Sequence, residues 1–302
     1  MLISMQTVKS AKITTLADNV VYVSRLLGQF GFSALLELRD NKGRKHSIIF
    51  DTSSNKTALL HNVKALKVDL APLESIVLSH GHYDHTSATV EIAKRAKDKI
   101  KVYAHPNAFQ PKYKIEKGKK KHHGMPKGEG RVEIEKTGAK VIETVQPTEI
   151  LPGVMASGEI PRTTSFEKFP WKVMTITDGS QVRDRLLDDQ ALFINIARKG
   201  VLVVCGCAHA GLINTLEHAL NVTKTRKLYG FIGGTHLIQP KETQLKETIA
   251  RLKKFDLQLI SPAHCTGHKS IAALNQAFPE NFVLNYTGRV IDTAKQLKNP
   301  VF

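Results

Sequence analysis

Four side chains that can bind a metal ion lie within six residues: His80, His82, Asp84 and His85. They follow a short apolar run, so they belong to a loop at the end of a predicted strand. Gly81 lets the backbone bend until His80 and His82 turn toward one point and Asp84 and His85 toward a second. Imidazole nitrogen suits zinc or iron, and carboxylate oxygen adds negative charge. The pattern predicts two neighbouring cations; the alternative is a histidine-rich surface loop.

Three further histidines each follow an apolar run and lie in a turn of small residues: His209, His236 and His264. The runs that precede them read VLVV, YGFI and LQLI. Because the carboxyl ends of neighbouring parallel strands meet at one edge of a sheet, we expect these histidines to converge. We predict His209 and His264 as metal ligands and His236 as a catalytic residue beside them.

Near these motifs, Cys207 and Asp51 each have two possible interpretations, and Cys265 is expected to have no role. Cys207 is either a thiolate ligand or inert packing beside an apolar strand, and Cys265 is expected to be a bystander. Asp51 follows the run HSIIF. Its carboxylate either accepts an N–H from a ligating histidine or caps the helix that follows.

The composition indicates a globular chain of ordinary type. Of 302 residues, 41% are hydrophobic and 24% charged, which excludes disordered, collagenous and coiled-coil proteins. No apolar run approaches the roughly 18–20 residues of a membrane helix, and the first residues lack the pattern of a secretory signal. Three cysteines cannot form a disulfide framework. We therefore expect a cytoplasmic protein with no membrane contact, and the sequence does not indicate its oligomeric state.

The positive charge is concentrated in one segment. The net charge is +17, and the segment Lys112–Lys127 contains seven lysines and one glutamate, which is +6 of that total. Such a run is either a solvated surface loop or a site for an anionic partner. Nucleic acid is one such partner, but aromatic residues are only 6% of the chain and do not interleave with the basic ones as base stacking requires.

The pattern of apolar runs predicts an α/β chain with strands first and alternating strands and helices later, in each half. Strands are predicted at 12–16, 20–23, 33–38, 47–50, 75–78, 101–104, 140–144, 153–156, 171–176, 191–196, 201–204, 229–232, 257–260 and 282–284. Helices are predicted at 56–66, 88–96, 212–220, 244–254 and 270–277. Residues 106–131 have no stable period and are predicted to form a basic surface excursion. We expect two sheets packed face to face with helices outside, in one domain spanning 1–302.

The metal-binding residues resemble those of the metallo-β-lactamase superfamily. Its H-x-H-x-D-H motif is matched by His80, His82, Asp84 and His85, and its closing histidine by His264. The motifs GEIPR, DDQAL, GCAHAG, GGTHL and HCTG are similar to one branch, which contains archaeal methanopterin-pathway synthases and many uncharacterised hydrolases. The resemblance extends from about residue 31 to 288 and weakens over 111–135.

The resemblance implies a four-layer αββα sandwich with two divalent metal ions at its edge, first of all Zn²⁺, with Mg²⁺, Mn²⁺ and Fe²⁺ as alternatives. His80, His82 and a later histidine would hold one ion, and Asp84, His85 and His264 the other. The chain departs from the family where a bridging aspartate is usual, because that turn reads Gly206-Cys207. Glu159 is a further ligand candidate, with pairing to Arg162 as the alternative.

These expectations favour a dinuclear metal-dependent hydrolase that acts through a metal-bound hydroxide on an ester, amide, lactam or phosphoester. Asp84 would take the proton, while Arg162 and Lys112 would bind an anionic or phosphorylated small molecule. The alternative is a methanopterin-pathway synthase that condenses a dihydropterin pyrophosphate with a ribosyl-aminobenzene phosphate. An RNA-processing nuclease is a second alternative, and a ligand sensor without catalysis is disfavoured by the intact motif.

Overall fold

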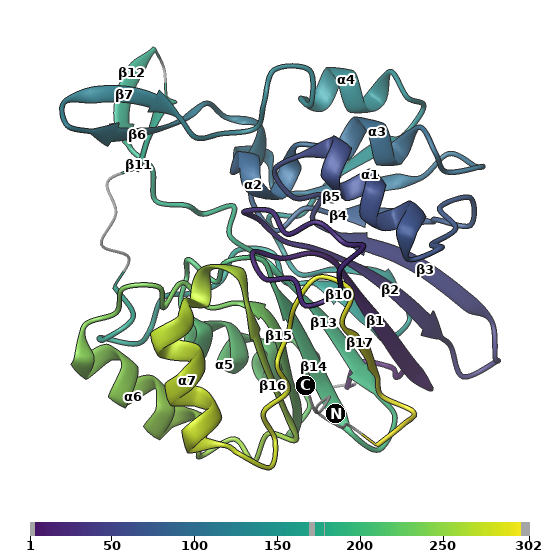
Figure 1. The fold of residues 1–302 in the computed structure, drawn as a ribbon, viewed down its shortest axis with the longest axis vertical. Coiled ribbons are helices and arrows are strands. Elements are labelled where there is room, and N and C mark those ends of the chain that lie inside the picture. Colours follow the sequence, from purple (N-terminus) through teal and green to yellow (C-terminus); the bar gives the residue numbers. More distant parts are fainter. Residues whose placement is uncertain (1–3, 169–172, 178, 297–302) are drawn as a thin grey trace.

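Two large β-sheets lie face to face at the centre of the protein, and a computed structural model describes residues 4–168, 173–177 and 179–296 (Figure 1). The first sheet has the order β17-β1-β2-β3-β4-β5-β8 and the second β16-β15-β14-β13-β10-β9. The first sheet consists of β1 (Ser10–Ala17), β2 (Ser33–Arg39), β3 (Lys45–Phe50), β4 (Ser75–Val77), β5 (Lys101–Ala104), β8 (Lys140–Glu143) and β17 (Val290–Asp292). The second consists of β9 (Thr148–Leu151), β10 (Val154–Ala156), β13 (Ala191–Ile196), β14 (Gly200–Cys205), β15 (Leu228–Gly234) and β16 (Leu259–Ala263).

Helices cover the outer face of each sheet. The first sheet is covered by α1 (Lys56–Ala65), α3 (Thr89–Ala93) and α4 (Arg131–Glu135), and the second by α5 (Leu212–Thr223), α6 (Glu242–Leu252) and α7 (His268–Ala277). Shorter helices are α2 (Tyr83–Thr86), η1 (Pro106–Phe109) and η2 (His264–Thr266). The layers therefore run helix, sheet, sheet, helix, which confirms the predicted αββα sandwich.

Alternation along the strands explains these layers. In β3, Ile48 and Phe50 belong to the apolar core between the two sheets, whereas Ile49 packs into the core beneath α1 and α3. In β14, Leu202 and Val204 face the core between the sheets, whereas Val201, Val203 and Cys205 pack into the core beneath α5. Since side chains of a strand point alternately to its two faces, a sheet covered on both sides needs apolar residues at successive positions.

Each large sheet is antiparallel in one part and parallel in the other. Strands β3, β4, β5 and β8 are parallel neighbours, and so are β14, β15 and β16. The carboxyl ends of β4, β14, β15 and β16 carry the histidine-bearing turns. The parallel register therefore gathers residues that lie far apart in the sequence.

A third, smaller sheet stands beside the body of the molecule (Figure 1). This small sheet has the order β12-β11-β6-β7. It consists of β6 (Lys112–Glu116), β7 (Lys119–His122), β11 (Val173–Thr177) and β12 (Ser180–Arg183). Two of its strands, β6 and β7, lie in the segment 106–131 that we expected to be an excursion without regular structure. Lysine-rich strands lack the apolar alternation that reveals a strand, and here β6 is stabilised by pairing with both β7 and β11.

Two predicted strands are wrong. Residues 20–23 make a single bridge, Val21 to Thr287, and 282–284 likewise make only the bridge of Phe282 to Ile260. Phe282 is buried in the core beneath the helices of the second sheet. An apolar run predicts burial, and burial does not require pairing in a sheet. The helix predicted at 88–96 is also shorter, since α3 spans only Thr89–Ala93. The first two residues of the strand predicted at 171–176 lie outside the described residues.

Among the described residues, the search for a helix with the length and apolar character of a membrane span finds none.

Candidate metal centre

The loop after β4 buries all four side chains of the H-x-H-x-D-H motif. His80 and His85 are completely inaccessible to solvent, and His82 and Asp84 nearly so. The turn needs glycine at position 81, because a Cβ there would lie 2.0 Å from the carbonyl oxygen of Ala108. The histidine-rich surface loop, which was the alternative interpretation, does not fit this burial.

Asp51 anchors the loop through three hydrogen bonds. Its Oδ1 accepts from the backbone N–H of Ser79 at 2.7 Å, and its Oδ2 accepts from Ser79 Oγ at 2.7 Å and His85 Nδ1 at 2.6 Å. Helix α1 is capped by the side chain of Asn55. The cap interpretation of Asp51 is therefore wrong, and its carboxylate instead orients a histidine.

These hydrogen bonds fix the tautomers of two histidines. Because Ser79 Oγ donates to Asp51, it accepts from His80 Nδ1 at 2.8 Å, so we assign the proton of His80 to Nδ1. His85 Nδ1 likewise donates to Asp51. In both rings the lone pair then resides on Nε2, which faces His82 in the case of His80 and the Sγ of Cys207 in the case of His85.

The first group of candidate ligands is His80, His82 and His209. His80 Nε2 lies 2.9 Å from His82 Nδ1 and 3.2 Å from His209 Nε2. His209 follows β14 and is 5% exposed. The predicted convergence of the motif with the end of β14 is therefore present in the structure.

The second group is Asp84, His85 and His264. Asp84 Oδ2 lies 3.7 Å from His85 Nε2 and 3.3 Å from His264 Nε2. His264 Nδ1 lies 2.9 Å from Oδ1 of Asn19, an acceptor that also receives the N–H of Gly31. This contact directs the Nε2 of His264 toward Asp84.

Cys207 lies between the two groups. Its Sγ is 3.2 Å from His85 Nε2. The ligand atoms of His80, Cys207 and His209 lie within 4.8 Å of one another, and so do those of His85, Cys207 and His264. Cys265 is a neighbour whose Sγ accepts from the backbone N–H of His236 at 3.2 Å and donates to the carbonyl of Cys207 at 3.6 Å. Of the two cysteines, Cys207 alone belongs to these two triads.

Burial controls the charge of the cluster. Burial lowers the pKa of His80, His82 and His209, and repulsion from neighbouring histidines lowers it further. These rings are therefore neutral and able to coordinate a metal ion. Burial opposes the ionisation of Asp84, but His85 and His264 hold the pKa of its carboxyl well below its usual range.

Two other groups must lose a proton before they can coordinate. Burial works against a charge on His264, yet Cys265 and Asp84 raise its pKa to about 9. Burial raises the pKa of the Cys207 thiol. Metal binding would displace both protons, so affinity for the metal should rise with pH.

His236 lies at the open side of the cluster. Its ring centroid is 4.5 Å from that of His209, and both rings line a cavity with Glu167 and Gln244. Burial and the charge of His264 lower the pKa of His236 to about 4. Its predicted catalytic role stays a prediction that this position permits.

Three other predicted residues lie outside the cluster. Glu159 pairs with His105 Nε2 at 3.1 Å, and Arg162 donates to the carbonyl of Leu186. Glu159 and Arg162 both line a separate cavity of about 620 Å³. Lys112 is 1% exposed, and this burial does not support its predicted contact with substrate.

Lys112 instead forms a buried ion pair that fastens the small sheet to the loop. Its Nζ donates to Asp184 at 2.8 Å and Asp188 at 3.0 Å, and these carboxylates raise its pKa against the effect of burial. The second carboxylate oxygen of Asp188 accepts the backbone N–H of Gly81 at 2.8 Å. Asp188 therefore connects Lys112 directly to the backbone of the H-x-H-x-D-H motif.

Sequence reasoning missed residues that position the cluster: Asn19, Ser79, His123, Asp184 and Asp188. Ser79 precedes the motif directly, and Asp188 lies within DDQAL, so both had a weak signal. Asn19 and His123 had none, because each lies on a segment that only the folded chain brings to the site.

The residues fit a pair of divalent metal ions. Buried nitrogens face one another at 2.9 and 3.2 Å in the first group, and in the second Asp84 Oδ1 has no hydrogen-bond partner among the described residues. A buried cluster of lone pairs is costly unless a cation occupies it. Neutral imidazole and thiolate suit Zn²⁺ or Fe²⁺ better than Mg²⁺.

The protein is similar over almost its full length to an archaeal enzyme. It is 32% identical over 295 residues to the 7,8-dihydropterin-6-methyl-4-(β-D-ribofuranosyl)-aminobenzene-5′-phosphate synthase of Methanocaldococcus jannaschii, covering 96% of this chain and 99% of that protein. The model of the β-lactamase superfamily domain matches residues 46–153. The chain belongs to the metallo-β-lactamase superfamily. A second relative, uncharacterized protein MJ0448 of the same organism, is 31% identical over 92% of this chain and 99% of its own length.

Solved structures of superfamily members share the fold. Tm1679, described as a metal-dependent hydrolase of the β-lactamase superfamily, superposes with a TM-score of 0.76 at 21% identity, covering 93% of this chain and 98% of that one. The metallo-β-lactamase fold protein YhfI from Bacillus subtilis gives a TM-score of 0.54 at 14% identity, covering 94% and 99%. At these identities the likeness concerns the fold alone.

Proposed function

We propose that this enzyme joins a dihydropterin pyrophosphate to a ribosyl-aminobenzene phosphate, as the named archaeal relative's product implies. One observation carries the proposal: the 32% identity to that synthase extends over 96% of this chain and 99% of the relative. The hydrolase that we expected first has less support, because it rests on the fold that synthases and hydrolases share.

The condensation forms a bond between the pterin methyl carbon and the amine nitrogen, while pyrophosphate leaves and the amine loses a proton. Two divalent ions, Zn²⁺ before the alternatives, would neutralise charge that develops on the leaving group. His80, His82 and His209 would hold one ion, and Asp84, His85 and His264 the other. Cys207 would contact both.

Asp84 is the proposed acceptor of the amine proton. Its Oδ2 faces His264 at 3.3 Å, while its buried Oδ1 has no hydrogen-bond partner among the described residues. One oxygen can therefore serve as ligand and the other receive a proton. His236, beside His209 at the cavity that both line, is placed to contact a substrate that enters there.

Basic residues near the cluster would bind the phosphorylated substrates. Arg162 and Arg185 line the cavity of about 620 Å³ together with Glu159, His218 and apolar side chains. Two guanidinium groups can grip several phosphate oxygens at once. We propose this cavity for one phosphorylated end of a substrate.

The test is incubation of the zinc-loaded protein with dihydropterin pyrophosphate and the aminobenzene ribotide, followed by mass spectrometry of the products. We expect the coupled product and one equivalent of pyrophosphate. A Cys207→Ala, His264→Ala double variant is the control without an intact centre. Release of phosphate or pyrophosphate without coupled product would favour the hydrolase, and no reaction with either substrate would contradict the proposal.

A further inference from the structure

One nitrogen at the metal centre has no use in the functions described so far. His82 faces the first group through Nδ1, so when Nδ1 holds a metal ion the neutral ring would carry its proton on Nε2. This Nε2 is buried and has no hydrogen-bond partner among the described residues. A buried N–H donor without an acceptor is costly, and a negatively charged oxygen is the acceptor that satisfies it best.

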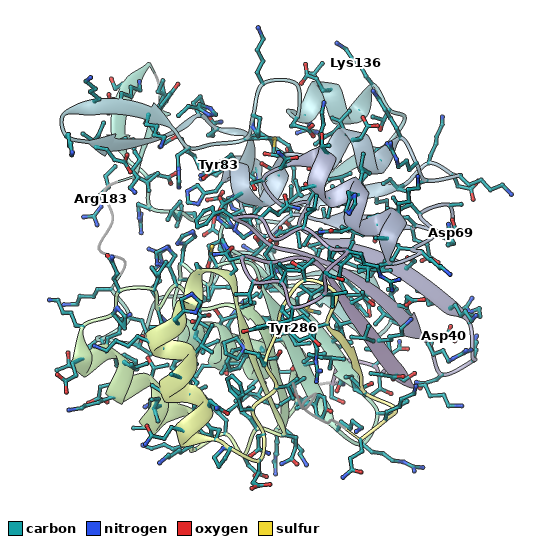
Figure 2. All side chains as sticks on the ribbon, in the orientation of Figure 1. Asp40, Asp69, Tyr83, Lys136, Arg183 and Tyr286 are labelled. Atoms are coloured by element: carbon teal, nitrogen blue, oxygen red, sulfur yellow. The ribbon has the colours of Figure 1, made fainter. Side chains whose placement is uncertain are left out.

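The small sheet brings a second imidazole to the same place. The ring centroid of His123 lies 4.5 Å from that of His82, and its backbone carbonyl accepts from the N–H of Tyr83 at 3.2 Å. Gly124 forms an isolated bridge with His82. Tyr83, labelled in Figure 2, lies where the small sheet meets the body of the molecule.

Two lysines share the face of the small sheet that carries His123. Lys114 of β6 lies directly opposite Lys121 of β7, and His123, the first residue after β7, is close enough to both lysines to experience their charge. Side chains two residues apart in a strand share a face. The buried Lys112 also shares this face, which is therefore turned toward the metal loop. The adjacent His122 points to the other face, where it contacts Tyr113.

The charges on this face are only partly balanced. Like charges directly opposite each other in a sheet are destabilising. Lys114 pairs with Glu116 at 2.7 Å, whereas His123 experiences both lysines as well as the carboxylates of Glu116 and Asp84. An anion held between His82, His123 and Lys121 would offset this repulsion and accept the orphaned N–H.

We propose that His82 Nε2, His123, Lys114 and Lys121 form a subsite for a phosphoryl group at the edge of the metal centre. The inference rests on the proposed function, which supplies two phosphorylated substrates. The pyrophosphate of the pterin is the larger anion and the leaving group at the metal centre, and the ribotide phosphate is the other source of the same chemistry.

The test is calorimetric titration of inorganic pyrophosphate, and separately of phosphate, into the zinc-loaded protein, with zinc content measured afterwards. We expect His123→Leu to weaken pyrophosphate binding at least about tenfold, as loss of a hydrogen bond to a charged group predicts. His122→Leu changes the neighbouring ring on the opposite face and should alter affinity less than about twofold. Equal affinity for both variants, with zinc retained, would overturn the subsite.

A second pair of variants, one on each face of the small sheet, tests the subsite if His123→Leu does not fold. Lys121→Met should weaken binding several-fold, by roughly the 1 kcal/mol of an exposed charge pair, and Lys120→Met on the opposite face should not. Equal effects of the two substitutions would overturn the subsite. The KM of each phosphorylated substrate then shows which of the two binds in the subsite. In Lys121→Met the KM of that substrate should rise, and the KM of the other substrate should stay constant.

Failure of the subsite and failure of the proposed function give different results. If no coupled product forms while Lys121→Met still weakens pyrophosphate binding, the function is wrong and the subsite stands. If product forms and both lysine variants bind pyrophosphate as the parent protein does, the function stands and the subsite is wrong.

Discussion

The loop at 80–85 and the strand ends of the second sheet contribute to the same centre in different ways. The loop supplies four candidate ligands from one stretch of chain, held by Asp51 and Ser79 directly beneath it. The second sheet supplies single residues after β14 and β16, whose positions depend on the parallel pairing of β14, β15 and β16. Dense local hydrogen bonding positions the first set, and sheet register positions the second.

The difference shows why Cys207 is informative. It belongs to the second sheet, yet its Sγ lies 3.2 Å from a loop histidine and takes part in both triads. The two regions therefore meet at one sulfur atom. Six substitutions test how the two regions are held and whether they contribute equally to metal binding, beginning with the largest expected effect.

His82→Ala removes a candidate ligand of the loop and His264→Ala a candidate ligand at a strand end. We expect each variant to lose at least one metal ion per chain and more than about a hundredfold in activity, because a catalytic ion supplies several kcal/mol. Elemental analysis and turnover measure this, with the exposed His122→Ala as control. Unchanged metal content in either variant would show that the substituted histidine is not needed to hold a metal ion.

Lys112→Met tests how much the buried ion pair between the small sheet and the loop stabilises the protein. The substitution leaves Asp184 and Asp188 buried without their cation, so the free energy of unfolding should fall by about 3–5 kcal/mol. Urea denaturation measures it. Lys120→Met, on an exposed strand, should change stability by less than about 0.5 kcal/mol. A small loss in Lys112→Met would show that the small sheet does not depend on this ion pair.

Cys207→Ser keeps the shape of the side chain and removes the thiolate. With Co²⁺ in place of zinc, the parent protein should show a sulfur-to-metal charge-transfer band in the near ultraviolet, and this band should vanish in the variant. We expect metal affinity to fall about 10–1000-fold, since a soft ligand is lost. Cys265→Ser should keep the band. A band that survives in Cys207→Ser would make Cys207 a packing residue.

Asp51→Asn weakens the support of the loop without removing a ligand. Asparagine tolerates the left-handed backbone at this position, where φ is 58°, so the fold should persist. Metal affinity should fall about 10–100-fold because His85 loses its charged acceptor. Competition with a chelator measures the change. Affinity equal to that of the parent protein would mean that the loop needs no help from Asp51.

Asn19→Ala is the corresponding change at a strand end. Asn19 orients His264 through a neutral amide at 2.9 Å, and its other contacts are to backbone groups. We expect a loss of metal affinity near the lower limit of the same range, about tenfold. The chelator competition used for Asp51→Asn applies here. A larger loss than in Asp51→Asn would reverse the inferred order of the two regions.

Much of the fold could be predicted from local patterns, and the exceptions have a common cause. The helix predicted at 212–220 is α5, and the strands around β3 and β14 are where the apolar runs placed them. The strands missed, β6, β7, β9, β12 and β17, are short or polar and are stabilised by their neighbours. The strands wrongly predicted at 20–23 and 282–284 contain apolar residues that make one bridge each; Phe282 is buried, whereas none of residues 20–23 is.

The sequence by itself determined the chemistry of the centre. The types and spacing of His80, His82, Asp84 and His85 give four side chains able to bind a metal within six residues, whatever the fold, whereas their common burial is a property of the folded chain. The net charge and its concentration at 112–127 are likewise properties of the chain alone.

Only the tertiary structure decided which distant residues complete the centre and which do not. Lys112 and Lys121 look alike in the sequence, yet one is buried between two carboxylates and the other lies on an exposed strand. His123 and Cys207 reach the loop at 80–85, and Asn19 reaches His264, from three separate segments of the chain. Contacts between segments far apart in the chain depend on how sheets pair and pack, and a single residue's type carries no information about that pairing.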